Sequence, residues 1–215
     1  MRFNFLNKIA AGLIISASCL INAANAGIIY SNDFESDSAG FTGPTDIMNG
    51  GATGTNFLGE LTQGETPILT LNGLAAHSSI TIDFDIYGLR SLDGVNNGDN
   101  FQFLVNGVSQ FTDFYGHSGG FIIGPTTGQL VSHDQTAFGF GHFYGGASTY
   151  HYSVTLAHVD PSISFGFQAN TNQSWGDEAF GLDNVVVSSV AVPEPSTIAI
   201  LGLGLMGLAA RRFKK

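Results

Sequence analysis

The sequence has very little positive charge. It contains seven Lys and Arg residues against seventeen Asp and Glu residues. Two of the cations, Arg2 and Lys8, lie near the N-terminus and four lie in the last five residues, so Arg90 is the single cation between residues 27 and 192. Nucleic acids and anionic membrane surfaces attract cations, so this acidic segment is predicted to bind neither. Its charge suits divalent cations or neutral ligands such as glycans.

Cysteine is almost absent, since Cys19 is the only one in the chain. It lies in a segment that starts with two cations, continues with an apolar run from Ile9 to Ile21 and ends on Ala24-Asn25-Ala26. This order is typical of a secretory signal peptide, predicted here as residues 1–26. Removal of the signal peptide would leave a chain without a disulfide, a thiolate metal site or a cysteine nucleophile.

Helical periodicity is also missing from the middle of the chain. Ser79 to Tyr87 instead alternates between apolar and polar residues, with Asp83 and Asp85 on the polar face. This period of two indicates a half-buried strand. Further strands are expected at Ile28–Phe34, Ile68–Leu71, Phe101–Val105, Tyr152–Leu156, Ile163–Phe167 and Phe180–Val187. Asn-Gly and Asp-Gly pairs separate many of them, which predicts an all-β fold, a jelly-roll β-sandwich over residues 27–191.

Two stretches do not follow this strand pattern. Thr42–Thr55 is rich in Gly and Thr, and Tyr115–Gly146 is rich in Gly, Phe and His. Loops of such length are uncommon and often functional. The alternative is that strands run through Phe121–Ile123 and Ala137–Phe143, interrupted by glycine bulges.

The last segment, residues 192–215, has three parts in a fixed order. Pro193-Glu194-Pro195 comes first, an uncharged apolar run from Ile198 to Ala210 follows, and four cations stand in the last five residues. The prolines hold the backbone extended. The apolar run is predicted to form a short transmembrane helix, and the basic end is what the positive-inside rule expects of a cytoplasmic flank.

This tail resembles the PEP-CTERM sorting signal of Gram-negative, exopolysaccharide-producing bacteria. Pro193, Glu194 and Pro195 match the tripeptide of that signal, and Arg211 with Arg212 matches the start of its basic cluster. The resemblance implies export through the inner membrane, a transient membrane anchor, and recognition by an exosortase-type membrane protease. It further implies a final location at the cell surface or in the extracellular matrix. The alternative is an ordinary C-terminal anchor with an incidental proline hinge.

Two short stretches resemble the concanavalin-like jelly rolls that PEP-CTERM proteins often carry: residues 93–107, from Asp93-Gly94 to Asn106-Gly107, and residues 175–185, which begin with Trp175-Gly176-Asp177-Glu178. The opening Asn32-Asp33-Phe34-Glu35 resembles the first strand of β-sandwich carbohydrate-binding modules, whose last strand carries Asp-Asn-Val, as Asp183-Asn184-Val185 does here. In those modules carboxylates near these two strands hold a structural calcium ion. The resemblance therefore implies a Ca²⁺ site on Glu35 and Asp183, with Asp33 as a further donor. Calcium takes six to eight oxygens, which two carboxylates, carbonyls and water can supply.

The calcium prediction has alternatives at two places. Asp183 and Asn184 could simply hydrogen-bond a neighbouring part of the chain. The run Asp93–Asp99 also carries acids, but Val95 stands where an EF-hand loop needs an oxygen. That run is therefore predicted to be a turn.

Four aromatic residues are candidates for stacking against sugars: Trp175, Tyr115, Tyr144 and Tyr150. They would serve a lectin-like module if they lined one exposed face, whereas buried they belong to the core. The Glu-x-Asp-x-x-Glu pattern of concanavalin-like sandwich hydrolases is absent. The chain is thus predicted to be a non-enzymatic protein of the exopolysaccharide matrix or envelope. A carbohydrate-binding module and a glycan-active hydrolase are the alternatives.

Overall fold

The computed structural model describes residues 26–49, 55–96, 98–116, 127–134, 146–174 and 176–192. Residues 26–190 form a compact unit. The predicted signal peptide lies outside the described residues apart from its last residue, as do the Pro-Glu-Pro motif, the apolar run and the basic end. None of the helices formed by the described residues is long and apolar enough to span a membrane.

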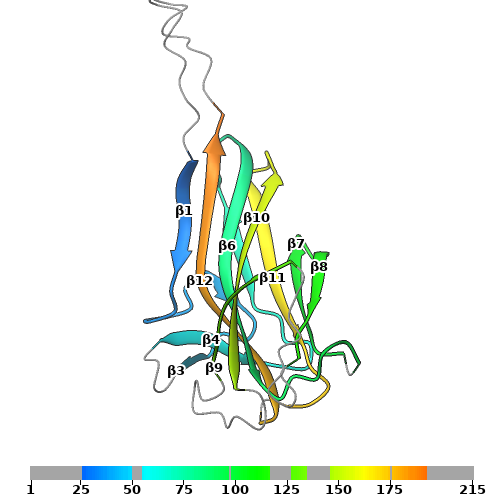
Figure 1. The fold of residues 1–215 in the computed structure, drawn as a ribbon. Helices are drawn as coiled ribbons and strands as arrows, with labels where there is room; N and C mark the ends of the chain where they lie inside the picture. Colours follow the sequence, from blue (N-terminus) through cyan, green and yellow to red (C-terminus); the bar gives the residue numbers. More distant parts are fainter. Residues whose placement is uncertain are drawn as a thin grey trace, which may run out of the picture. The chain divides into compact units, whose positions relative to one another are not determined.

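Two antiparallel sheets face each other (Figure 1). The first sheet contains β1 (Ala26–Asn32), β3 (Ile47–Asn49), β4 (Asn56–Leu61), β6 (His77–Arg90), β9 (Gln129–Asp134), β10 (Ala147–Ala157) and β12 (Glu178–Ala191). The second sheet contains β2 (Phe41–Thr42), β5 (Ile68–Asn72), β7 (Asn100–Val105), β8 (Val108–Phe114) and β11 (Ser162–Asn170). The chain passes repeatedly from one sheet to the other, which confirms the predicted all-β jelly-roll sandwich.

Aromatic rings fill the space between the sheets. Phe84 on β6 stacks on Tyr152 of the neighbouring β10 at a centroid distance of 5.1 Å. It also meets Phe167 of β11, in the opposite sheet, edge to face at 5.2 Å. On β6, the apolar residues from Ile80 to Ile86 are buried, and Asp83 and Asp85 on the outer face are partly exposed. The alternation in the sequence therefore defines the inner and outer faces of this strand.

Most of the predicted strands are present with longer bounds, but the structure contains five further strands. Of these, β2 overlaps the edge of the expected loop Thr42–Thr55, β3 lies inside that loop, and β4 begins directly after it. Strand β8 follows the turn after β7. Strand β9 lies inside Tyr115–Gly146. The alternative strand positions, Phe121–Ile123 and Ala137–Phe143, lie outside the described residues.

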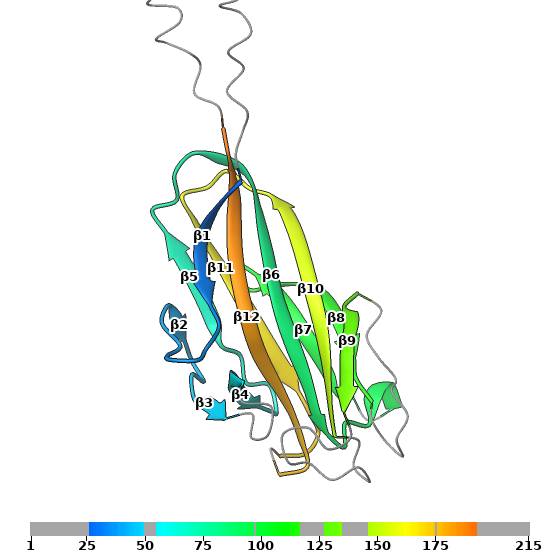
Figure 2. The ribbon, with the colours of Figure 1, turned by 60° about the vertical axis from the view of Figure 1, so that its left-hand side comes forward.

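The first and last strands of the sandwich are neighbours (Figure 2). Ala26 pairs with Val190 and Asn32 pairs with Val185 in antiparallel register. The start of β6 lies at the same end, because Ser78 Oγ donates a hydrogen bond to the Val190 carbonyl at 3.4 Å. We call this the tail end of the sandwich. The opposite end, where β6 finishes and β12 begins, is called the far end.

Candidate metal centre

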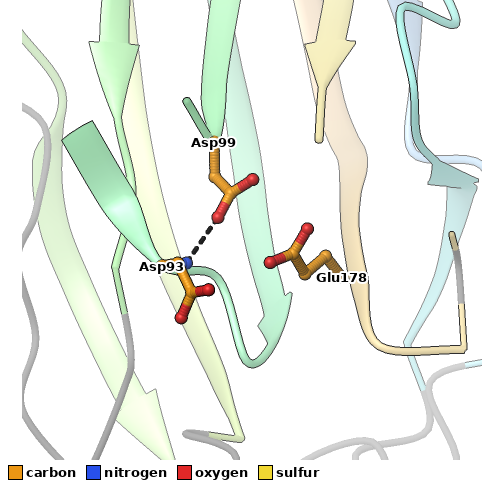
Figure 3. Close-up of side chains that lie close together, drawn as sticks. All are labelled: Asp93, Asp99 and Glu178. Atoms are coloured by element: carbon orange, nitrogen blue, oxygen red, sulfur yellow. Dashed lines mark hydrogen bonds between the residues drawn. The ribbon is translucent and has the colours of Figure 1, made fainter. Parts of the chain in front are cut away.

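Three carboxylates meet at the far end of the sandwich (Figure 3). Asp93 and Asp99 come from the connection between β6 and β7, and Glu178 is the first residue of β12. One carboxylate oxygen from each lies within 4.8 Å of the other two. Asp99 and Glu178 are fully buried, and Asp93 is partly exposed. The fold thus joins acids that are distant in sequence.

A tight turn brings Asp93 and Asp99 together, as predicted for this run. It contains a 3-10 helix, Gly94–Asn96, and Gly94 has a φ of +76°, a left-handed conformation that glycine adopts without a steric penalty. The backbone N–H groups of Gly98 and Asp99 donate to the Gly94 carbonyl at 2.9 and 3.2 Å. The Asp93 N–H in turn donates to Asp99 Oδ2 at 2.5 Å. The turn therefore places both carboxyl groups on the same part of the sandwich.

Glu178 is positioned by the loop that leads into β12. Its backbone N–H donates to the Ser174 carbonyl at 3.2 Å, and its Oε2 accepts a hydrogen bond from the Gln173 N–H at 3.1 Å. Its second oxygen, Oε1, is buried and has no hydrogen-bond partner among the residues that the structure describes. Figure 3 shows this carboxylate directed toward the other two.

The pKa values of the two buried acids, Asp99 and Glu178, are both raised. Burial first, and then repulsion from Asp99, raises the pKa of Glu178 to about 7. Burial also raises the pKa of Asp99, although hydrogen bonds from the N–H groups of Asp93 and Asn172 oppose this effect. An all-oxygen set of this kind suits a hard divalent cation such as calcium or magnesium.

The calcium ligands predicted from the sequence lie elsewhere and have hydrogen-bond partners. Asp183 is fully buried in β12 and accepts hydrogen bonds from the Tyr87 hydroxyl and the Asn184 N–H, both at 2.7 Å. Glu35 Oε1 accepts from the Asn56 N–H at 3.1 Å. Burial raises the pKa of Asp183 to about 6, and the charge of Glu35 adds to this increase. A calcium site on Glu35, Asp183 and Asp33 stays a prediction.

Two of the aromatic candidates for sugar stacking are core residues, which corrects that part of the prediction. Tyr115 is 0% and Tyr150 is 3% exposed. The Tyr115 ring meets the rings of Tyr150 and Phe180 edge to face, at centroid distances of 5.1 and 5.0 Å. Neither of the two tyrosine rings is therefore accessible to a sugar in this structure. The other two candidates, Trp175 and Tyr144, lie outside the described residues.

Comparison with known proteins identifies the tail. Residues 191–215 match the family model of the PEP-CTERM protein-sorting motif, as predicted. A search of curated proteins gave no match. Similar solved structures include a family 35 carbohydrate-binding module from an environmental isolate, at 17% identity and a TM-score of 0.42, covering 77% of this chain and all of that one. Another is the family 35 module of Abf62 from Cellvibrio japonicus, at 18% identity and a TM-score of 0.41, covering 78% and 99%.

Proposed function

We propose that this chain is an exported, non-enzymatic β-sandwich protein that an exosortase-type membrane protease processes at its PEP-CTERM motif. The observation that carries the proposal is the match of residues 191–215 to that motif. After passage through the inner membrane, the tail serves as a transient anchor. The sandwich then works at the cell surface or in the extracellular polysaccharide matrix.

The fold supports a removable tail. The last strand, β12, ends at Ala191, before the first residue of the tripeptide, Pro193. Cleavage at the motif would leave every described strand in place. This gives the proposed organisation of the precursor: a signal peptide at 1–26, the sandwich at 27–191 and the sorting signal at 192–215.

The positions of the acids favour a non-enzymatic protein. A glycoside hydrolase needs two carboxyl groups that flank a bound sugar. Asp99 and Glu178 are close together, but both are fully buried and out of a sugar's reach. On the outer face, Asp85 is engaged by His151, whose Nδ1 lies 2.8 Å from its carboxylate. These arrangements do not provide an accessible acid and base pair.

Replacing the tripeptide tests the proposal directly. In the variant with Pro193→Ala, Glu194→Ala and Pro195→Ala, we expect a membrane-bound chain that has lost its signal peptide but keeps its tail. The wild type should instead reach a lower mass. Mass spectrometry of the membrane and released fractions from a host with an exosortase measures both outcomes. A variant that reaches the wild-type mass and location would show that the tail is an ordinary anchor.

A second candidate function is carbohydrate binding, favoured by a pocket beside β1 and β12 that several carboxylate, amide and hydroxyl side chains line. The pocket has a volume of about 400 Å³, and Tyr30, Asp33, Asp37 and Asn184 are among its lining residues. Carboxylate and amide groups in a pocket of this size can hydrogen-bond the hydroxyl groups of one or two sugar units. Two of these residues, Asp33 and Asn184, belong to the motifs that resemble carbohydrate-binding modules.

An array of neutral and acidic glycans tests the pocket. We expect the wild type to retain at least one glycan and Asp37→Ala to weaken that binding about tenfold or more, because a hydrogen bond to a charged group contributes about 1.5–3 kcal/mol. Asp160→Ala removes an exposed acid from the turn between β10 and β11 and serves as the matched control. Equal loss in both variants would point to net charge instead of the pocket.

A further inference from the structure

We propose that Asp93, Asp99 and Glu178 hold a calcium ion that joins the β6–β7 connection to the start of β12. This inference goes beyond the proposed function, because sorting at the tail requires no ion. The ion would act as a structural staple at the far end of the sandwich. It would add to the hydrogen bonds that Ser91 already donates to Asp177 between the same two connections.

The separation of the carboxylates fits one ion. Calcium lies about 2.3–2.6 Å from each oxygen ligand, so two ligands of one ion are at most about 5.2 Å apart. The three carboxylate oxygens are within 4.8 Å of one another. These separations are therefore in the range expected for three ligands of a single calcium ion. Carbonyl groups and water would complete its coordination.

The environment of Glu178 is the second observation that supports a calcium site. Its Oε1 is buried, has no hydrogen-bond partner among the described residues, and belongs to a carboxylate that faces Asp93 and Asp99. A buried polar atom without a partner is costly, and a like charge beside it adds to the cost. A bound cation would remove both costs, because it supplies the missing partner and reverses the sign of the local interaction.

The donor set favours calcium over other metals. All three side-chain donors are carboxylates, whereas structural zinc sites use cysteine and histidine. Magnesium demands a near-ideal octahedron, which a loop and a strand end do not readily supply. Calcium accepts an irregular geometry, and extracellular modules bind it with Kd values of roughly 10⁻⁴–10⁻³ M. Asp93 is partly exposed, so the ion and its water ligands have access to the site.

Calorimetry and thermal unfolding of the purified full chain in mild detergent test the site. Titration with CaCl₂ should give a binding heat, and the melting temperature should be higher in excess calcium than in EDTA by several degrees, on the order expected for a site-specific ligand. MgCl₂ should bind more weakly, and equal binding of the two metals would overturn the choice of calcium. A wild type without a binding heat and without a thermal shift would overturn the site.

Variants separate a metal ligand from an ordinary buried acid. Glu178→Gln keeps the shape of the side chain and should weaken calcium binding more than about tenfold, since even indirect partners of a metal contribute that much. In EDTA this variant should be at least as stable as the wild type, because it removes a carboxylate from beside Asp99. A merely structural Glu178 would give a less stable variant in both conditions, which would contradict the proposal.

Two further variants locate the ion. Asp93→Asn changes the least buried of the three acids, so it tests the site even if Glu178→Gln folds poorly, and it should also reduce the calcium-dependent shift. Asp183→Asn should keep the shift in full. Loss of the shift in Asp183→Asn, with a wild-type shift in Asp93→Asn and Glu178→Gln, would overturn the proposal and place the ion near Glu35 instead.

Discussion

Two tyrosine hydroxyl groups form a buried chain that ends on an acid. The Tyr115 and Tyr152 hydroxyl oxygens are 2.5 Å apart, and the Tyr152 hydroxyl donates to Asp113 Oδ2 at 3.0 Å. Since the Tyr152 proton points at Asp113, Tyr115 must donate to Tyr152. Burial raises the pKa of both tyrosines above the usual value, so both keep their protons. The chain links β8 to β10 across the two sheets.

Removing the first hydroxyl of this chain should destabilise the sandwich. We expect Tyr115→Phe to lower the free energy of unfolding by about 1–2 kcal/mol, the contribution of a buried hydrogen bond. Tyr30→Phe removes an exposed hydrogen bond to the Ala39 carbonyl and should cost less. Urea denaturation measures both. An unchanged stability of Tyr115→Phe together with a loss of glycan binding would contradict a core role for this ring.

At the scale of single residues, only part of the candidate metal centre could be predicted from the sequence. An EF-hand loop is excluded at Asp93–Asp99, because Val95 lacks the oxygen that such a loop requires. In the structure the third carboxylate, that of Glu178, comes from β12 and not from the same loop. No spacing in the sequence connects it to the turn. Only the pairing of strands brings it there.

At the level of elements, a strand was predictable where only one of its faces is covered. Along most of β6 the outer face is partly exposed, so the sequence alternates clearly. Toward the far end this pattern fails, and Tyr87, expected on the outer face, is 6% exposed. There the side chain of Phe57, which belongs to β4 of the same sheet, packs on Tyr87, and the two rings meet edge to face at 5.4 Å. A second small core forms outside the sandwich interior.

Glycine conceals the strands of this region from sequence analysis. The first half of β12 is buried and pairs with β4, and the Phe57 side chain of β4 lies so close that a Cβ on Gly181 would be 2.6 Å from Phe57 Cδ2. Only glycine permits that approach. In a sequence, however, glycine usually indicates a turn. In β4, Gly59 also interrupts the short apolar run by which a strand would be predicted. Glycine in the sequence therefore does not distinguish a closely packed strand from a loop.

At the scale of the whole molecule, the main electrostatic feature is the excess of acids between residues 27 and 192. The one cation between residues 27 and 192, Arg90, forms an ion pair with Glu60 at the far end. The sixteen acids of this range give it a strongly negative charge, which repels polyanions. A cation that neutralises part of this charge would stabilise the fold, which agrees with the calcium site proposed above.

The β1–β12 pair makes the sandwich complete before its tail begins. Val187, the register partner of Tyr30, is 0% exposed, and Val190 pairs with the first described residue, Ala26. A chain that ends at Val192 should therefore keep the melting temperature of the full chain and its response to calcium. A chain that ends at Val186 lacks the strand residues that pair with the start of β1.

The shorter truncation should lose more than about 2 kcal/mol of the free energy of unfolding, because deleting one fully buried aliphatic side chain already costs about that much. Chemical denaturation of the two truncated chains and the full chain measures the difference. A chain ending at Val192 that unfolds well below the full chain would show that the sorting tail contributes to folding. Equal stability means instead that β12 closes the folded unit, so that a protease acting at Pro193–Pro195 releases a sandwich that needs no refolding.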